Sequence, residues 1–382
     1  MGSGGWRMSY DPEARRDTPL ALKLKERIRR DGAITLDAYM IACPYDPDYG
    51  YYTRQPAIGR DGDFITAPEI SQTFGELTGL WCAVVWQSMG SPKPFNLIEL
   101  GPGRGTLMAD ALKAARIVPD FAGAAAVHLI ESNTTLRDAQ QKALAGAQSP
   151  ITWHANASQA LRAPQSPIQG PAIIIANEYL DTFPIEQSIF ADGQWLLRTV
   201  ALDGGDCLML ATGGATRDTP PDRLQDLAKP GDVFEYRDGF YELADDLARK
   251  GSGAAPLAAL FIDYGHIQTA LGDTLQGVKS HRQVPPFETP GETDLTAQVD
   301  FEAFGTAMTR VGFIVDGPVT QAEFLGRLGI IERASKLMTA NPEKAAEIEA
   351  GVARLIAPNG MGTRFKAIGI RSAGLPPLPG FA

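Results

Sequence analysis

The sequence predicts an α/β protein whose mostly parallel sheet is covered by helices on both faces. Short apolar runs typical of buried strands alternate with segments of helical periodicity. A glycine-rich turn after the first run is typical of a strand followed directly by a helix. The chain has 382 residues, of which 44% are hydrophobic, so it can bury a large core. The expected strands are 96–100, 127–131, 151–154 and 172–176, and the expected helices between them are 106–116, 134–145 and 157–162.

Helices are expected before this alternating region. Residues 20–40 have a helical pattern that Asp31-Gly32 interrupts, which predicts two helices. The next segment, 45–66, is rich in aromatic and turn residues and is expected to be a long functional loop. Thr66-Ala67-Pro68-Glu69 then has the capping hydroxyl, early proline and carboxylate of a helix start. The helix that follows is expected to bury one stripe made of Ile70, Phe74, Leu77, Trp81 and Val84.

The second half of the chain is expected to insert a hairpin and then complete the sheet. Residues 195–202 and 207–211 flank a turn typical of a β-hairpin, and a helix is expected near 240–250. A strand at 257–265 precedes a polar loop over 266–299. The last expected elements are a helix from Asp300, a strand at 312–315, a helix capped by Thr320 and Glu323, and a strand at 364–370. The predicted parts are a flexible tail 1–19, an N-terminal helical region 20–94, a core 95–190, an insertion 191–255 and the rest of the sheet with C-terminal helices 256–375.

Composition narrows the possible functions. The formal net charge of −10 argues against a broad nucleic-acid-binding surface. The three cysteines and four histidines have no metal-ligand spacing, so no metal site is expected. No window approaches the roughly 18 apolar residues of a spanning helix, so no membrane insertion is expected. We expect a cytoplasmic protein in a bacterium, or a mitochondrial-matrix protein in a eukaryote although no transit peptide is visible.

The stretch FNLIELGPGRGTLMADAL, residues 95–112, indicates a nucleotide-type cofactor. A dinucleotide fold needs Gly-x-Gly-x-x-Gly or Ala, with a carboxylate about 20 residues further on. Here Thr106 occupies the third small position, and the next strand-end carboxylate, Glu131, comes later than that. The pyrophosphate site is therefore poorly matched. Glu99 ends the apolar run, and the glycines that follow it are Gly101, Gly103 and Gly105.

S-adenosylmethionine has no phosphates, and these residues suit it better. Glycines let the backbone approach the cofactor closely, because a Cβ would intrude. Glu99 can hold the cofactor's ammonium, Glu131 can accept hydrogen bonds from both ribose hydroxyls, and Asn156 can frame the adenine edge. Each feature alone has a structural alternative, since the glycines can form a tight turn and Glu131 can cap the helix near Asn133. Their order favours methyl transfer over hydride transfer.

The fourth strand ends in Asn177-Glu178-Tyr179-Leu180-Asp181, which we expect beside the reactive sulfonium. Methyltransferases that act on amino groups of bases often have Asn/Asp-Pro-Pro-aromatic here, whereas this chain has two carboxylates. A guanidinium is planar and permanently charged, and carboxylates can bind it bidentately. We therefore expect Glu178 and Asp181 to orient an arginine side chain, with Asn177 on the cofactor side. Alternatively, Asp181 caps a short helix and Glu178 pairs with a structural arginine.

Eight ordered motifs between residues 20 and 371 resemble the MidA family of S-adenosylmethionine-dependent methyltransferases of bacteria and mitochondria. The resemblance implies a class I methyltransferase fold (Rossmann-like) with inserted segments. It also implies protein arginine methylation linked to assembly of respiratory complex I, through a core subunit of that NADH dehydrogenase. By position it implies cofactor binding by Glu99 and the three glycines, and an acceptor-side motif at Asn177, Glu178 and Asp181. The motifs are YDPDYGYY, GDFITAPEISQTFGEL, IELGPGRGTLMADAL, NEYLDTFPIEQ, FIDYG, GDTLQGVKSHR, PGETDLTAQVDF and TQAEFLGRLGI.

Two positions depart from the family pattern. Leu180 stands where a second aromatic is usual, and Gln298 stands where the family usually has a histidine. A general-base role for that histidine therefore cannot be assumed in this chain. Two other functions remain open at this point: an RNA or small-molecule methyltransferase on the same fold, and a non-catalytic assembly factor that binds S-adenosylmethionine. The sequence assigns no oligomeric state.

Overall fold

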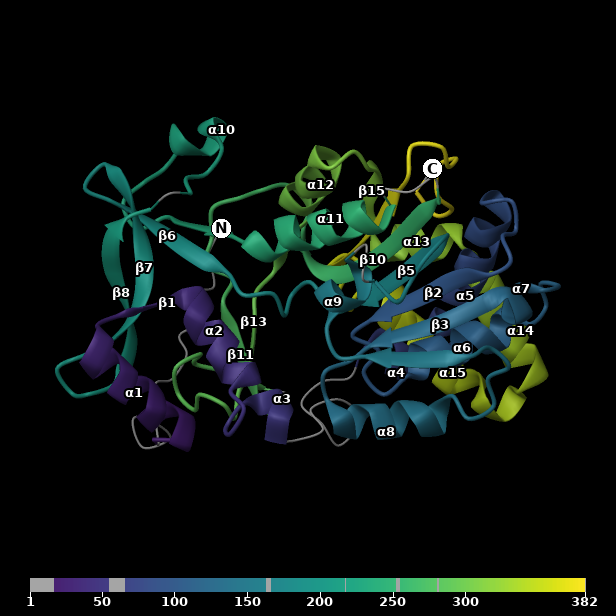
Figure 1. Cartoon of the computed structure of the whole chain (residues 1–382), viewed down its shortest axis with the longest axis horizontal. Helices are drawn as coiled ribbons and strands as arrows, with labels where there is room; N and C mark the ends of the chain where they lie inside the picture. The colour runs from purple at the N-terminus through teal and green to yellow at the C-terminus, as the bar shows by residue number, and fades with distance from the viewer. Residues whose placement is uncertain are drawn as a thin grey trace.

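The computed structural model describes residues 17–54, 66–162, 166–216, 218–251, 255–279 and 282–381. It contains a large sheet with helices on both faces and a smaller sheet to one side (Figure 1). In Figure 1 the large sheet lies on the right with α5, α6, α14 and α15, and the smaller sheet lies on the left with α1. Within the described ranges, no helix is long and apolar enough to cross a membrane.

The helices of the described chain are α1 (Pro19–Asp31), α2 (Leu36–Tyr45), α3 (Tyr51–Arg54), α4 (Ala67–Ile70), α5 (Gln72–Ser88), α6 (Thr106–Ala115), α7 (Phe121–Ala124), α8 (Thr134–Ala143), α9 (Ala157–Leu161), α10 (Asp222–Gln225), α11 (Asp238–Gly251), α12 (Phe301–Arg310), α13 (Gln321–Arg327), α14 (Ile330–Ala340), the 3₁₀ turn η1 (Pro342–Lys344) and α15 (Ala345–Ile356). The strands are β1 (Ile34–Thr35), β2 (Phe95–Leu100), β3 (Ala125–Ile130), β4 (Ile151–His154), β5 (Ala172–Asn177), β6 (Glu186–Ala191), β7 (Gln194–Leu202), β8 (Leu208–Ala215), β9 (Val233–Tyr236), β10 (Leu257–His266), β11 (Gln276–Lys279), β12 (Arg282–Val284), β13 (Asp294–Thr296), β14 (Val299–Asp300), β15 (Ile314–Thr320) and β16 (Phe365–Arg371).

The large sheet has the strand order β15-β16-β10-β5-β2-β3-β4, and β14 also pairs with β10. The run from β4 to β10 is parallel. Only β16 reverses direction in this order, because it pairs antiparallel with both β10 and β15. The prediction of a mostly parallel α/β sheet is therefore confirmed. From β2 the chain moves outward to β3 and β4, and then returns to β5 on the other side of β2. Ligands bind outside the carboxyl ends of the strands at such a switch point.

Both faces of the large sheet are buried, which explains the nearly continuous apolar strands of the sequence. Successive side chains of a strand point to opposite faces. In β2, Leu97 packs in a core with residues of α5 and α6, whereas Ile98 packs in a second core with residues of α11 and α12. Helices therefore cover each face, as the alternation of strands and helices predicts.

The smaller sheet has the order β1-β7-β6-β9, with β8 paired to β7, and a three-stranded sheet β12-β11-β13 accompanies it. A third core lies here, in which Leu24 of α1 and Tyr39 of α2 pack with Val200 of β7 and Leu295 of β13. The N-terminal helices therefore pack in two different cores: α1 and α2 pack in this third core, whereas α5 packs against the large sheet. The expected tail lies outside the described residues up to residue 16, and Thr18 caps α1.

Most expected elements are confirmed, including the hairpin of β7 and β8 and the capping box of Thr320 and Glu323. The expected helix after Thr66 is wrong in its continuity, because Ser71 separates α4 from α5. The buried stripe is wrong at Val84, which is 46% exposed, whereas Val85 is 1% exposed. A period of 3.6 residues places Val85, and not Val84, on the face of Phe74. The expected polar loop over 266–299 instead contains β11, β12 and β13.

Candidate active site

A cavity of about 770 Å³ lies at the carboxyl ends of the parallel strands. Residues that follow β2, β3, β4 and β5 line one side of it, and residues of α2, α3 and α11 line the other. Of the residues predicted to bind cofactor or acceptor, five line it: Gly101, Gly103, Glu131, Asn156 and Glu178. The long aromatic loop expected at 45–66 contributes Tyr45 and Tyr52, and its stretch 55–65 lies outside the described residues.

The glycine loop after β2 brings the backbone to the cavity wall. Gly101 and Gly103 have φ angles of +64° and +53°, in the left-handed region that favours glycine. A Cβ on Gly101 would lie 3.0 Å from the Tyr179 ring. Gly105 has a different surrounding: it precedes α6, and its Cβ would lie 3.2 Å from Gln140, outside the cavity lining. The side chains of Tyr179 and Gln140 therefore pack against the loop at Gly101 and at Gly105. Of the three glycines, Gly101 and Gly103 line the cavity.

Glu99 is a buried carboxylate directly before this loop. It is 2% exposed, and its Oε2 has no hydrogen-bond partner among the described residues. Burial, and next the negative charge of Glu131, raises the pKa of Glu99 to about 8. An unsatisfied buried oxygen is costly, so Glu99 is suited to a donor that arrives with a ligand.

Glu131 follows β3 and is buried at the cavity wall. Its Oε1 accepts a hydrogen bond from the backbone N–H of Asn133 at 2.8 Å, and burial raises its pKa. The cap of α8 is Asn133 itself, whose side chain accepts from Thr135 and Leu136. Gln140, which the sequence analysis missed, donates from Nε2 to the Gly103 carbonyl at 2.7 Å and so ties α8 to the glycine loop. Its signal in the sequence was a polar residue on the buried face of α8.

The two predicted asparagines have different surroundings. Asn156 lines the cavity and also caps α9, because its side chain accepts the N–H of Gln159 at 3.0 Å. Asn177 ends β5 and donates from Nδ2 to Oε1 of Glu178 at 3.2 Å. Its Oδ1 is buried and has no partner among the described residues, and it is not part of the cavity lining.

Glu178 lies at the cavity wall with a φ of +52°, which non-glycine residues rarely adopt. Its Oε1 accepts from the backbone N–H of Ala67 at 3.2 Å and from Asn177. These described partners are not arginines, which argues against the structural ion pair considered above. Burial, and next the charge of Asp181, raises the pKa of Glu178 to about 7. The first residue of α4 and the end of β5 together hold this carboxylate.

Asp181 is buried and lies outside the cavity lining. The side chain is 6% exposed, and no described donor reaches Oδ1. Burial raises the pKa of Asp181 to about 6, and the nearby guanidinium of Arg237 opposes the rise. No helix follows it before β6, so the capping alternative is wrong. Of the predicted acceptor pair, Glu178 lines the cavity, and a role of Asp181 stays a prediction.

The cavity lining is strongly acidic. Among the residues that the structure describes, it contains seven carboxylates and no lysine, arginine or histidine. Burial raises the pKa of Asp238, and the charges of Asp218 and Asp37 add to the rise, so these groups repel one another. Three of the seven, spaced i, i+4 and i+8, share one face of α11, a spacing that was visible in the sequence. The seven are Asp37, Glu131, Glu178, Glu186, Asp238, Glu242 and Asp246.

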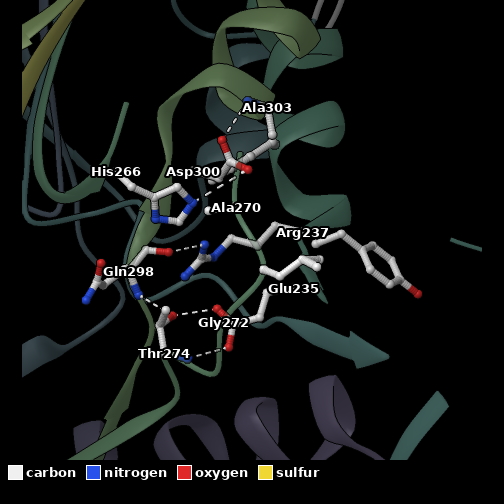
Figure 2. A pocket seen from close by; sticks show the side chains of 12 residues that line it. Glu235, Arg237, His266, Ala270, Gly272, Thr274, Gln298, Asp300 and Ala303 are labelled. Carbon is white, nitrogen blue, oxygen red and sulfur yellow. Dashed lines mark hydrogen bonds and ion pairs between the residues drawn. The ribbon is translucent and has the colours of Figure 1, made fainter. Parts of the chain in front are cut away.

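Gln298 lies in a second, smaller cavity of about 220 Å³ (Figure 2). Its backbone carbonyl accepts from Nη1 of Arg237 at 2.7 Å, and its N–H donates to Thr274. His266 and Asp300 face each other there, with Nε2 and Oδ2 3.7 Å apart (Figure 2). Position 298, to which the resemblance assigns a histidine, therefore does not share the cavity of Glu178. Within the described ranges, no group of three or more His, Cys, Asp or Glu side chains is arranged to hold a metal ion.

Comparison with known proteins identifies the family. Residues 77–319 match the model of the Methyltransf_28 family, described as S-adenosyl-L-methionine-dependent methyltransferases. A Drosophila melanogaster relative, named "Protein arginine methyltransferase NDUFAF7 homolog, mitochondrial", is 34% identical over 91% of this chain and 83% of its own length. The Homo sapiens relative, "Protein arginine methyltransferase NDUFAF7, mitochondrial", is 30% identical over 94% of this chain and 86% of its own. A COG1565 superfamily protein from Burkholderia thailandensis, bound to S-adenosyl-homocysteine, is 25% identical, with a TM-score of 0.80 over 98% of this chain and 97% of its own.

Proposed function

We propose that this chain transfers a methyl group to the guanidinium of an arginine in a protein. The chain belongs to the Methyltransf_28 family of S-adenosyl-L-methionine-dependent methyltransferases and has the class I methyltransferase fold. The observation that carries the proposal is the acidic lining of the large cavity, with Glu178 at the carboxyl end of β5. Seven carboxylates, with no cationic side chain among the described residues of the lining, attract a positively charged group and repel phosphates.

The residues of the cavity wall, with the buried Glu99 outside the lining, fit S-adenosylmethionine, which when bound supplies an electrophilic methyl group. Glu99 Oε2 is a buried oxygen without a donor in the described chain, and a cofactor ammonium would provide one. Gly101 and Gly103 bring backbone without a Cβ to the cavity wall, which permits close approach of a ligand. In this proposal Glu131 accepts hydrogen bonds from the ribose hydroxyls, and Asn156, which follows β4, contacts the base. Asn177 donates a hydrogen bond to Glu178, although Asn177 itself is not part of the cavity lining.

Glu178 is the residue we assign to the guanidinium. Its Oε1 already accepts two N–H groups, and no donor from the described chain reaches Oε2, which is left for the acceptor. A charge-assisted hydrogen bond at Oε2 would orient one guanidinium nitrogen, and such alignment supplies a large part of a transfer barrier. When that nitrogen gains a methyl group it loses a proton, which the carboxylate of Glu178 is placed to accept. Asp181 is assigned no direct contact.

Aromatic side chains support the choice of a cationic acceptor. Tyr45, Tyr52, Tyr179 and Phe183 line the same cavity as Glu178. The faces of such rings attract cations, and arginine does so more often than lysine. A nucleic-acid acceptor would bring phosphates next to seven carboxylates, which opposes binding. The names of the relatives support the same class, and the MidA resemblance supports a respiratory complex I core subunit as the protein that carries the arginine.

The proposal is tested with tritiated S-adenosylmethionine, the purified chain and an extract from cells that lack it. After labelling, half of the sample is digested with protease and half with ribonuclease, and the labelled protein is hydrolysed for amino-acid analysis. We expect label that protease releases and that is recovered as methylarginine. Label released by ribonuclease would replace this proposal with RNA methylation. No label, with S-adenosylhomocysteine still bound in calorimetry, would leave a non-catalytic assembly role.

A further inference from the structure

Asp263, which ends the buried part of β10, binds the loop that follows Glu178. It is 1% exposed, and its Oδ2 accepts the backbone N–H groups of Tyr179, Leu180 and Asp181 at 3.0, 2.8 and 3.2 Å. Its Oδ1 accepts the N–H of Tyr264 at 2.9 Å. One oxygen of this β10 side chain therefore accepts three consecutive backbone amides of the loop that follows Glu178 at the end of the neighbouring strand β5.

The same strand holds Glu178 from the other side. The N–H of Glu178 donates to the carbonyl of Ile262 at 2.9 Å, one residue before Asp263. Glu178 itself has a φ of +52°. Non-glycine residues rarely adopt this region, so the surrounding structure must hold Glu178 there. Hydrogen bonds before and after Glu178 both come from the end of β10.

We infer that Asp263 is a positioning residue that aims the carboxylate of Glu178 into the cavity by fixing residues 179–181. The inference rests on the proposed function of Glu178, since Asp263 does not line the cavity and acts only through the loop. Four backbone donors converge on its two oxygens, which matches the acceptor capacity of an ionised carboxylate.

The four N–H donors favour the ionised form of Asp263, whereas the surroundings of its side chain oppose it. Burial, and next the charges of Asp181 and Glu178, raises the pKa of Asp263 well above its usual range. A buried carboxylate is tolerated when it is fully hydrogen-bonded. Asparagine is nearly the same size, but both oxygens of Asp263 accept N–H groups. Either orientation of an asparagine amide would therefore place its NH₂ against a backbone donor.

The test compares the wild type with Asp263→Asn and with Asp316→Asn as a matched control. Asp316 is also a largely buried carboxylate, and it accepts the backbone N–H of Leu378 at 3.0 Å. It pairs with Arg371, and neither residue is part of the cavity lining. Hydrogen–deuterium exchange is measured first on the wild-type amides of residues 179–181 and then on both variants. Calorimetry gives S-adenosylhomocysteine affinity, and tritium transfer to extract proteins gives the turnover and the cofactor KM.

We expect exchange at 179–181 to be slow in the wild type and about 10-fold faster in Asp263→Asn, and unchanged in Asp316→Asn. Turnover should fall about 10- to 100-fold in Asp263→Asn, with the cofactor KM and S-adenosylhomocysteine affinity within about 3-fold of wild type. Because Asp263 acts through Glu178, adding Asp263→Asn to Glu178→Gln should lower turnover by less than about 2-fold more.

Fast exchange of these amides in the wild type would overturn the inference even if Asp263→Asn does not fold. Unchanged exchange in a folded Asp263→Asn would also overturn it, as would additive losses in the double variant. If the wild type transfers no methyl group at all, the proposed function fails, and the exchange comparison still shows whether Asp263 holds the loop.

Discussion

The negative charge of Glu131 acts on Glu99, whose pKa burial already raises, and together they bring it to about 8. Glu99 lies one residue before the end of β2, and Glu131 directly follows β3. The two strands are parallel neighbours, and Leu100 of β2 pairs with Ile130 of β3. Glu99 therefore holds a proton near neutral pH. In the proposed site, where Glu99 binds the ammonium of the cofactor, cofactor binding is coupled to release of this proton.

Binding of S-adenosylhomocysteine at pH 7 should release about one proton, because an ammonium beside Glu99 favours its ionised form. Calorimetry in two buffers of different ionisation enthalpy measures that number. Glu99→Gln should release none and bind about 10-fold more weakly. Equal proton release by wild type and Glu99→Gln would show that Glu99 does not meet the cofactor.

Gly101→Ala should abolish or strongly weaken S-adenosylhomocysteine binding. The new Cβ would lie 3.0 Å from the Tyr179 ring at a φ of +64°, so the loop or the ring must move. Gly326→Ala is the control, because no atom lies within 4 Å of a Cβ built there. Calorimetry on both variants checks the prediction. Wild-type affinity in Gly101→Ala would remove the glycine loop from the cofactor site.

Glu178→Gln should leave S-adenosylhomocysteine affinity within about 3-fold and lower turnover by about 100-fold or more. In the proposed mechanism the ionised form of Glu178 binds the guanidinium, and the pKa of Glu178 is about 7. The acceptor kcat/KM of the wild type should therefore fall as the pH drops below about 7, and rise to a plateau above it. A wild-type profile that is flat between pH 6 and 8 would contradict this role.

Neutralising the acidic face of α11 should weaken acceptor binding without changing the chemical step. In the double variant Asp238→Asn with Glu242→Gln, the acceptor KM should rise about 3- to 10-fold, and its dependence on salt should decrease. Asp226→Asn removes an exposed charge outside the cavity lining and serves as the control. The prediction fails if the double variant and Asp226→Asn raise the KM equally, or if kcat falls while the KM is unchanged.

The sequence predicted the parts of the site that depend on strand ends. Parallel strands bring their carboxyl ends together, so Glu99, Glu131 and Glu178 could be assigned to one region from the strand pattern alone. Asp181 could not be placed, because it is buried outside the lining although Tyr179 and Thr182 of the same loop line the cavity. No glycine marks that loop, and the hydrogen bonds that hold it come from Asp263, which is distant in the sequence.

Other features depend on packing between distant segments. The strands β11, β12 and β13 are short and partly polar, so they lack the alternation that reveals a strand. The backbone N–H of Ala67 reaches Glu178 only because α4 packs beside the end of β5. The sequence does not show that Gln298 lies outside the large cavity. Hydrogen bonds from Arg237 and to Thr274 hold its backbone in the smaller cavity.

The most direct measurement is a crystal structure of the chain with S-adenosylhomocysteine and an arginine-containing peptide, for the wild type and for Glu178→Gln. The account predicts the cofactor's amino group at Glu99, its ribose at Glu131, and the peptide guanidinium on Oε2 of Glu178, with that guanidinium absent or displaced in Glu178→Gln. A guanidinium bound at another carboxylate in the wild type, or unchanged binding in Glu178→Gln, would contradict it.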